Sequence, residues 1–260
     1  MSEREPRAEQ AEQPATGSGW YLYGVIRADA LAPLEKTGVL GAGDAVLAVR
    51  HGAVCALGSP APVDGGRETL VRHADLVQRV FDQTTILPAR YGVVLPDAEG
   101  VVAKLLGPYH EHLVAQLDRL EGTVQIDVTG VHVEARALGR LLKADRALAA
   151  RRHEANRGYA AAVRLGQHIA AGLERMRMED AATALDLLRR HAIDERGSAL
   201  THEHMFLHAS FLVRATGVAG FDNAVGELRR RLPHAVIRGV GPRAPYGFVQ
   251  LEAEAAPAWA

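Results

Sequence analysis

The chain has 260 residues, a length that suits two modest domains or one large one. Hydrophobic residues make up 48% of it and charged residues 23%, so it can bury an ordinary globular core, while a formal net charge of -1 gives no overall field that favours nucleic acid or an acidic membrane. The single cysteine, Cys55, excludes an internal disulfide and cysteine-based zinc sites, and this usage fits a reducing, cytoplasmic setting.

Residues 1–19 are polar, include two prolines and lack large apolar side chains. This composition predicts a disordered tail and not a signal peptide, which needs an apolar stretch. We expect order to begin at Trp20, with a strand over 21–26. No uninterrupted apolar run approaches the roughly 20 residues that a membrane-spanning helix needs, so no membrane span is expected.

The next elements are predicted from short apolar runs and their period. Two strands, 45–50 and 53–57, are expected around a turn at Gly52, which supplies the backbone freedom that the turn needs. Apolar residues then recur at helical spacing and predict a helix over 68–81. Its expected core face consists of Leu70, Ala74, Val77 and Phe81. Strand composition returns at 84–92.

A second helical pattern begins at Asp97, a suitable N-cap, and ends at Gly122, a suitable C-cap. A kink or split is expected near its middle, at Gly107-Pro108, because proline interrupts a helix. Strict alternation over 123–128 then predicts a half-buried strand, which 131–135 continues.

The order of these elements predicts an α+β protein with two domains. Residues 20–135 form a ferredoxin-like variant, in which a strand, a β-hairpin, a helix, a strand, a helix and a strand follow one another. Residues 136–256 form a C-terminal α+β domain that opens with a helical block over 137–192, where separate helices are expected over 159–178 and from Glu179. Its later elements are a strand, an amphipathic helix and two closing strands, over 205–213, 221–232, 235–240 and 247–251. No sequence repeat is visible between the two halves.

Two stretches that contain proline, 84–92 and 239–249, have the most distinctive composition in the chain. Because proline cannot donate to a β-ladder, each is expected at the edge or the mouth of a strand. Neither contains a nucleophile, a paired carboxylate or a metal ligand, which favours docking over catalysis. Arg90, in the first stretch, is expected either to pair with Asp127 or Glu121 or to lie exposed at a docking edge.

Three histidines could carry chemistry, since His202, His204 and His208 would face one side of a strand at their even spacing. They predict either the metal site of a small-molecule enzyme or a solvated strand start with scattered histidines. The H-E-x-x-H zinc pattern is not met there, because its fifth position is Phe206. The chain also lacks a P-loop and a G-x-S-x-G elbow, and Cys55 lies in an apolar pattern typical of an inert thiol.

The helical block from 140 to 164 is basic and includes Arg151 and Arg152. It is interpreted either as a solvated helix face or as a docking surface for an acidic protein partner. A nucleic-acid groove would need interleaved aromatic side chains, and Tyr159 is the single aromatic residue in the block, so no nucleic acid is expected.

Four segments with distinctive composition occur in order along the chain: 21–24, 85–92, 117–128 and 241–249. Taken together, they resemble the gas vesicle GvpF/GvpL family. Tyr21-Leu-Tyr-Gly24 resembles that family's opening Y-x-Y-G strand, and 85–92 is similar to its T-hydrophobic-L-P-x-R-F-G segment. Residues 117–128 resemble its L-x-x-L-x-G-x-x-E-x-x-V run, and 241–249 its G-P-x-P-P-Y-S-F element. The family's order is kept from residue 20 to residue 251.

Five positions depart from the family's pattern, of which Ala89 and Tyr91 are mild changes. Gln125 stands where an acidic residue is expected, so a salt bridge at that position is not expected here. Ala244 replaces the first proline of the P-P-Y triplet and Gly247 replaces the serine, and both changes should loosen that loop.

The resemblance implies an accessory or minor structural protein of the gas vesicle and not an enzyme. It also implies two α+β domains, the first of them ferredoxin-like, without a cofactor or a bound metal. Such a protein would reside in the cytoplasm and on the gas vesicle, and it would bind the hydrophobic shell protein and other accessory proteins during assembly. The compact helical block 159–178 favours the F-type over the L-type member.

The residues expected to contact these partners come from the two proline stretches and from the basic helices. They are Pro88, Arg90, Tyr91, Arg151, Arg152, Pro242, Pro245 and Tyr246. Two alternatives stay open: the metal-dependent enzyme that uses His202, His204 and His208, and a ligand-sensing regulatory module, since ferredoxin-like pairs often bind small effectors.

Overall fold

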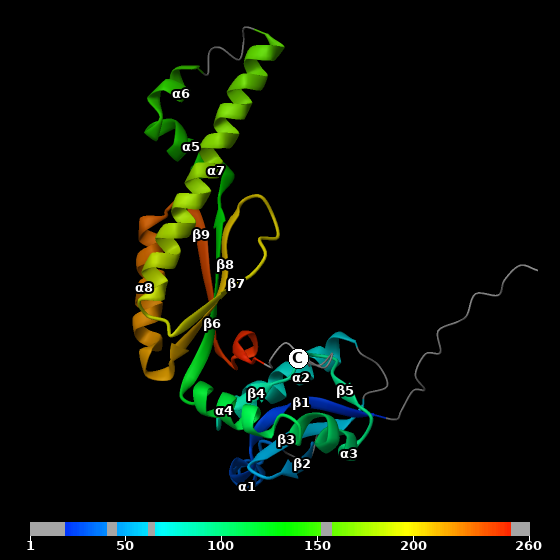
Figure 1. The fold of residues 1–260 in the computed structure, drawn as a ribbon. Helices are drawn as coiled ribbons and strands as arrows, with labels where there is room; N and C mark the ends of the chain where they lie inside the picture. Colours follow the sequence, from blue (N-terminus) through cyan, green and yellow to red (C-terminus); the bar gives the residue numbers. More distant parts are fainter. Residues whose placement is uncertain (1–18, 41–45, 62–65, 152–157, 251–260) are drawn as a thin grey trace, which may run out of the picture. The chain divides into compact units, whose positions relative to one another are not determined.

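A computed structural model describes residues 19–40, 46–61, 66–151 and 158–250 (Figure 1). The described chain divides into two compact units, the first ending at Val114 and the second beginning at Ala115. Each unit is built around its own antiparallel β-sheet. The fold class predicted from the sequence, α+β, is confirmed.

The sheet of the first unit has the strand order β2-β3-β1-β4, and the short β5 also pairs with β1. Along the chain the order is strand, helix, strand, strand, helix, strand, which is the ferredoxin-like pattern. The elements are β1 Trp20–Arg27, α1 Leu31–Lys36, β2 Leu47–His51, β3 Val54–Pro60, α2 Arg67–Phe81, β4 Ile86–Pro88 and β5 Val94–Leu95. The β2–β3 hairpin turns at Gly52, whose φ of 56° lies in the left-handed region.

Helix α2 covers this sheet with a different face from the one expected. Its buried residues are His73, Leu76, Val77 and Val80, whereas Leu70 is exposed. Of the four residues predicted for this face, Val77 is buried and Phe81 half-buried, while Leu70 and Ala74 are exposed. The face was predicted about one position away, and its polar member His73 is one that a count of apolar residues cannot find. The helical spacing itself was right.

The segment after β5 forms α3 (Ala98–Val101), a π-helical turn (Val102–Leu106) and α4 (His110–Leu120). Asp97 caps α3 by accepting a hydrogen bond from the Gly100 amide at 2.7 Å, as predicted for an N-cap. The expected split also occurs, since helical structure is interrupted between residues 106 and 110. Gly122, with a φ of 65°, follows α4 at the C-cap region, where glycine is favoured.

The sheet of the second unit has the order β7-β8-β6-β9. Its elements are β6 Thr123–His132, α5 Glu134–Ala144, α6 Arg146–Ala150, α7 Tyr159–Arg189, β7 Asp194–Gly197, β8 Met205–Arg214, α8 Val218–Arg231 and β9 Ala235–Arg243. If α7 is counted as the first helix, this is again strand, helix, strand, strand, helix, strand with the same strand order as the first sheet. The two units therefore share one topology although no sequence repeat is visible between them.

The boundary between the units differs from the one expected after residue 135. Strand β6 lies in the second sheet, where it pairs with β8 on one side and with β9 on the other. Its alternating residues Val124, Ile126 and Val128 are buried on the helix-covered face. Because β6 ends at His132 and α5 begins at Glu134, the expected strand over 131–135 also stops short.

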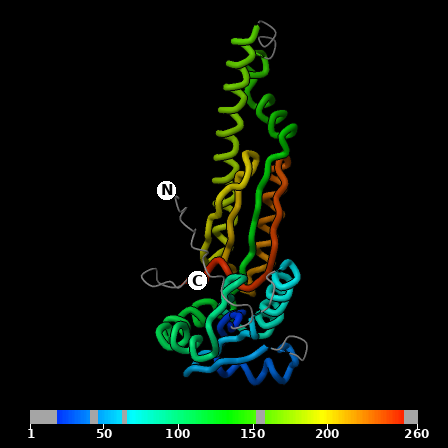
Figure 2. The backbone as a smooth tube through the Cα atoms, turned by 90° about the vertical axis from the view of Figure 1, so that its right-hand side faces the viewer, coloured from blue at the N-terminus to red at the C-terminus, as the bar shows by residue number. Residues whose placement is uncertain are grey.

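Helix α7 is one continuous helix of 31 residues, and not two helices that meet at Glu179. One half of α7 lies with α8 on a single face of the sheet, and the other half runs past the end of the strands beside α5 and α6 (Figures 1 and 2). That extension has a small core of its own, made of Ala137, Leu141, Leu148 and Met176. Within the described residues, no helix combines the length and the apolar character needed to cross a bilayer.

The packing of Trp20 on Gly58 gives a test of the first unit. A β-carbon at position 58 would lie 2.3 Å from the buried ring of Trp20. We expect Gly58→Ala to lower the free energy of unfolding by about 1–3 kcal/mol, because the ring must leave its place. Urea unfolding followed by tryptophan fluorescence and circular dichroism measures this change.

Gly166→Ala is the control. A β-carbon added at this position of α7 would have no steric clash, because no described atom of a neighbouring element lies within 4 Å. This exposed helical site should gain about 0.5–1 kcal/mol from the lower backbone entropy of alanine. Equal stability of the Gly58→Ala protein and the wild type would contradict the packing described.

Candidate functional site

The 84–92 segment runs along the edge of the first sheet, as its proline predicts. β4 pairs with Gly24–Ile26 of β1, and β5 pairs with Trp20 and Tyr21 farther along the same strand. Between them the chain stays attached to β1, because the Ala89 amide donates to the Tyr23 carbonyl at 2.9 Å. Pro88 is buried where β4 ends, and Arg90 lies exposed in the turn that separates the two short strands.

The buried imidazole of His73 contacts the backbone of this turn. The hydroxyl of Tyr21 lies 2.9 Å from Nδ1 of His73, and Nε2 of His73 lies 3.2 Å from the carbonyl of Ala89. The Tyr21 oxygen also accepts a hydrogen bond from the Gly92 amide at 3.3 Å. With Nε2 protonated and Nδ1 accepting from Tyr21, a neutral His73 satisfies all three contacts, so the turn depends on its staying neutral.

The pKa values follow from this burial. Desolvation lowers the pKa of His73, although its hydrogen bond to Ala89 opposes the change. Desolvation likewise raises the pKa of the Tyr21 hydroxyl to about 12. Both shifts keep the pair uncharged near neutral pH.

The sequence left two alternatives for Arg90, an ion pair with Asp127 or Glu121 and an exposed docking edge. Asp127 pairs instead with Arg243, and among the described residues no ion pair reaches Arg90. Tyr91, which is 36% exposed, donates its hydroxyl to the Gly66 carbonyl at 3.2 Å. The turn thus presents a cation and an aromatic ring on a fixed backbone, which is the docking-edge alternative for Arg90.

The second proline stretch, 239–249, begins within β9, an edge strand of the second sheet. Arg243 at its end pairs with Asp127 on β6, which also accepts hydrogen bonds from Ser210 and from Nε2 of Gln125. The Oε1 atom of Gln125 accepts from the Gly247 amide at 2.8 Å. An amide at position 125 can donate to Asp127 and accept from the loop at once, which explains why a carboxylate is not needed there.

The loop itself is anchored by hydrogen bonds, and the loosening expected from Ala244 and Gly247 stays a prediction. Ala244 and Pro245 are buried, Tyr246 is half-buried and Pro242 is exposed. Residues 246–248 form a 3-10 turn and not the strand expected over 247–251. The side chain of Arg119, on α4, donates to the Phe248 carbonyl and ties the end of the loop to that helix.

The basic helices present exposed cations. Arg151 lies exposed directly after α6, and Arg152 lies outside the described residues. Within the described residues, no ion pair occupies the exposed side chains of Arg136, Arg140 and Lys143 on α5. This fits either prediction for the block, a solvated face or an acidic partner.

The three suspected histidines do not form a site. β8 begins only at Met205, so His202 and His204 precede the strand and the even-spacing argument does not apply to them. The imidazole of His208 makes a hydrogen bond to the Ala199 carbonyl at 2.9 Å, and His202 is exposed. The structure therefore removes the geometric basis for an enzyme that uses these residues.

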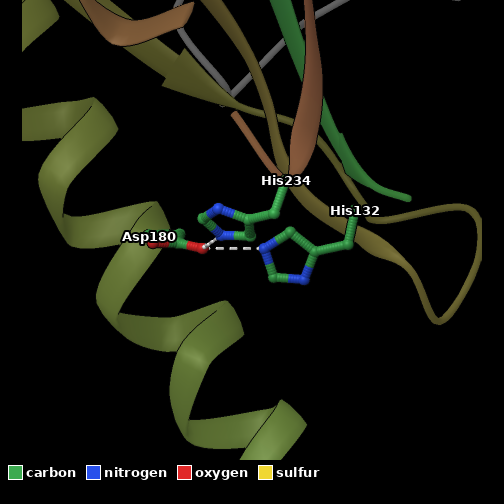
Figure 3. Close-up of side chains that lie close together, drawn as sticks. All are labelled: His132, Asp180 and His234. Carbon is green, nitrogen blue, oxygen red and sulfur yellow. Dashed lines mark hydrogen bonds and ion pairs between the residues drawn. The ribbon is translucent and has the colours of Figure 1, made fainter. Parts of the chain in front are cut away.

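A different histidine pair converges on a buried carboxylate (Figure 3). Oδ2 of Asp180, on α7, lies 2.8 Å from Nε2 of His132 at the end of β6 and 2.6 Å from Nε2 of His234 just before β9. Burial alone would raise the pKa of Asp180, but the hydrogen bonds from the two imidazoles outweigh it and hold that pKa below its usual value. Sequence reasoning missed this cluster because its members are about fifty residues apart and share no local motif.

Comparison with known proteins decides the family. Residues 19–250 match the profile of the family described as gas vesicle synthesis protein GvpL/GvpF. The chain belongs to this family. Gas vesicle protein F of Streptomyces sp. (strain CB03234) is 32% identical over 240 residues, which cover 88% of this chain and 99% of that protein.

Solved structures of GvpF proteins share the fold. The protein from Anabaena sp. PCC7120 superposes with a TM-score of 0.76 at 24% identity, covering 90% of this chain and 99% of that one. The protein from Microcystis aeruginosa gives a TM-score of 0.68 at 23% identity, covering 90% and 100%. The membership inferred from the motifs is therefore confirmed, and a role in gas vesicle assembly follows from the family.

The buried His73 makes the stability of this GvpL/GvpF member depend on pH. Its folded-state pKa is lowered, so the unfolded chain takes up the proton first, and stability is lost as the pH falls from the ordinary histidine pKa of about 6.5 toward the folded value. We expect this residue to contribute a slope of at most about 1.4 kcal/mol per pH unit. Urea unfolding at a series of pH values should show a smaller slope in His73→Gln than in the wild type.

His51→Gln is the matched control, since it removes a histidine of the same unit that has no hydrogen bond to the turn. An unchanged pH dependence in His73→Gln would show that the neutral imidazole does not hold the 84–92 turn.

The Gln125 amide gives a second test, on the C-terminal loop. Gln125→Glu removes the donor to Asp127 and places a second carboxylate beside it. We expect a loss of about 1–3 kcal/mol in the free energy of unfolding and faster amide exchange over residues 241–250. Gln167→Glu, the same change at an exposed site on α7, should leave both quantities unchanged. Equal exchange in the two variants would show that Gln125 does not anchor the loop.

Proposed function

We propose that this protein acts in the cytoplasm as a binding protein for gas vesicle assembly, where it holds the hydrophobic shell protein and other accessory proteins without catalysing a reaction. The observation that carries the proposal is the position of its two signature segments. Each lies on or next to the edge strand of a sheet, β4 with β5 in one unit and β9 in the other. An open edge can take up an extended segment of another chain through main-chain hydrogen bonds.

The exposed side chains on these edges suit an apolar partner. Val94 of β5 is 50% exposed, and Val240 of β9 is 58% exposed. A shell protein that forms an apolar wall exposes surface that aggregates unless it is covered during assembly. Edges that combine exposed valines with Arg90 and Tyr91 could cover such a surface and orient it.

Rigid positioning also supports docking. The turn at Arg90 and the loop at Pro245 are both fixed by buried polar side chains, so a partner would not need to order them on binding. Preorganised surfaces lose less entropy when they bind, which raises affinity. The ligand-sensing alternative stays a prediction, and no arrangement of the described residues favours it over docking.

Binding of the shell protein tests the first edge. We expect Arg90→Ala to weaken capture of purified shell protein by about tenfold or more, as is usual for a central arginine contact. Arg50→Ala is the control, because Arg50 is exposed on β2 at the opposite edge of the same sheet. Binding of the Arg90→Ala protein at the wild-type level would remove Arg90 from the contact surface.

The second edge is tested by a charge on β9. Val240→Lys should weaken the same capture, because an exposed lysine on an edge strand opposes strand pairing. Val163→Lys, at an exposed position of α7, should not change it. If neither Arg90→Ala nor Val240→Lys alters capture, the proposal that the sheet edges hold the shell protein fails.

A further inference from the structure

The buried cluster of His132, Asp180 and His234 has the donor set of a metal centre. We propose that it binds a divalent transition-metal ion of the zinc type. Each of the three side chains is more than nine-tenths buried, and the ligand atoms lie within 4.8 Å of one another. Two imidazoles and one carboxylate, with a fourth position left open, are a common protein ligand set for zinc.

The rings are turned the right way for coordination. Both present Nε2 toward the same oxygen of Asp180, as Figure 3 shows, so both nitrogens point at the space that an ion would share. Nδ1 of His234 is buried and has no hydrogen-bond partner among the described residues. A neutral ring that binds a metal through Nε2 carries its proton on Nδ1, so metal binding would place the proton of His234 on Nδ1, which would then donate to a water.

The spacing requires only a small movement. A tetrahedral ion with bonds of about 2.1 Å separates its ligand atoms by about 3.4 Å. The two nitrogen–oxygen distances in the cluster are 2.8 and 2.6 Å, so each ring must withdraw from the oxygen by less than about 1 Å. The two ring nitrogens, which lie within 4.8 Å of each other, must reach the same separation of about 3.4 Å. The three residues lie at the end of β6, in α7 and directly before β9, so the bound ion would join the long helix to two strands of the sheet.

Asp180 and His234 also line a pocket of about 1120 Å³, through which we expect the ion to enter. Its lining has more cations than carboxylates, since it includes Arg136, Arg140, Lys143, Arg146 and Arg175 against Asp145 and Glu179. These cations oppose an ion held by charge alone, such as magnesium or calcium, which prefer oxygen ligands. They oppose zinc less, because much of the energy of zinc binding comes from its bonds to imidazole nitrogens. The same cations favour an anion or a hydroxide at the open coordination position.

Metal binding to the stripped full-length protein tests the site. After treatment with a chelator, we expect zinc to bind with about one equivalent per chain and to raise the melting temperature, while magnesium does neither. Cobalt should give the visible absorption of a tetrahedral site in the wild-type protein. Asp180→Asn and His234→Asn should lose the zinc-induced melting shift and the cobalt spectrum.

Matched controls separate this site from surface binding. His204→Asn and His208→Asn, which change partly exposed histidines of the same unit, should keep both signals. If the cluster variants do not fold, the histidine NMR spectrum of the wild-type protein decides, since zinc should shift the Nε2 resonances of two buried rings. The proposal would be overturned if the wild type showed neither a melting shift nor a cobalt spectrum, or if the cluster and control variants gave equal signals. The three residues would then be a hydrogen-bonded cluster that joins α7 to the sheet.

Discussion

Both signature segments depend on buried polar side chains that reach them from neighbouring elements. A segment with proline and glycine at a sheet edge cannot complete a regular ladder, so its backbone groups need other partners. In the first unit His73 and Tyr21 supply them, and in the second unit Gln125 supplies them with the support of Asp127. Each of these groups is costly to bury unless it is hydrogen-bonded, so the edge and its anchor stabilise each other.

The shared topology explains why the two arrangements resemble each other. In each unit the signature segment belongs to the last strand of the strand-helix-strand-strand-helix-strand order, β4 after α2 and β9 after α8. That strand is the outer neighbour of the first strand, β1 or β6, and the first strand carries an anchoring side chain, Tyr21 or Gln125. A ferredoxin-like sheet leaves its last strand with one unpaired edge, so the same place is open in both units.

The sequence predicted those features that follow from local pattern. Alternation and helical spacing located most strands and helices, and the prolines located the edges. Pairing between strands was not predictable in the same way, because β6 alternates equally well whichever sheet it joins. The continuity of α7 was missed because Glu179 and Asp180 look like the start of a helix when their burial is unknown. The acidic side chain at position 180 is explained by its burial, where it bonds to two histidines, and not by the start of a helix.

The candidate site was predicted least well where buried polar residues form it. His73 falls on the core face of α2, and a search for apolar residues passes over it. Gln125 looked like a lost acidic residue until its two hydrogen bonds were known. His132, Asp180 and His234 meet only because β6 and β9 are neighbours in the sheet, and no spacing along the chain encodes that meeting.

Strand β9, the edge strand of the second unit, is held at both of its ends by polar side chains. His234 directly precedes β9 and bonds to Asp180 on the helix-covered face, while Arg243 ends β9 and pairs with Asp127 on the opposite face. Between these ends Val240 remains exposed. A metal ion at the first end would fix the start of the strand without occupying its open edge. Loss of metal binding therefore need not change docking, and loss of docking need not change metal binding. The metal site lies on the helix-covered face, whereas the docking surface is the open edge of β9.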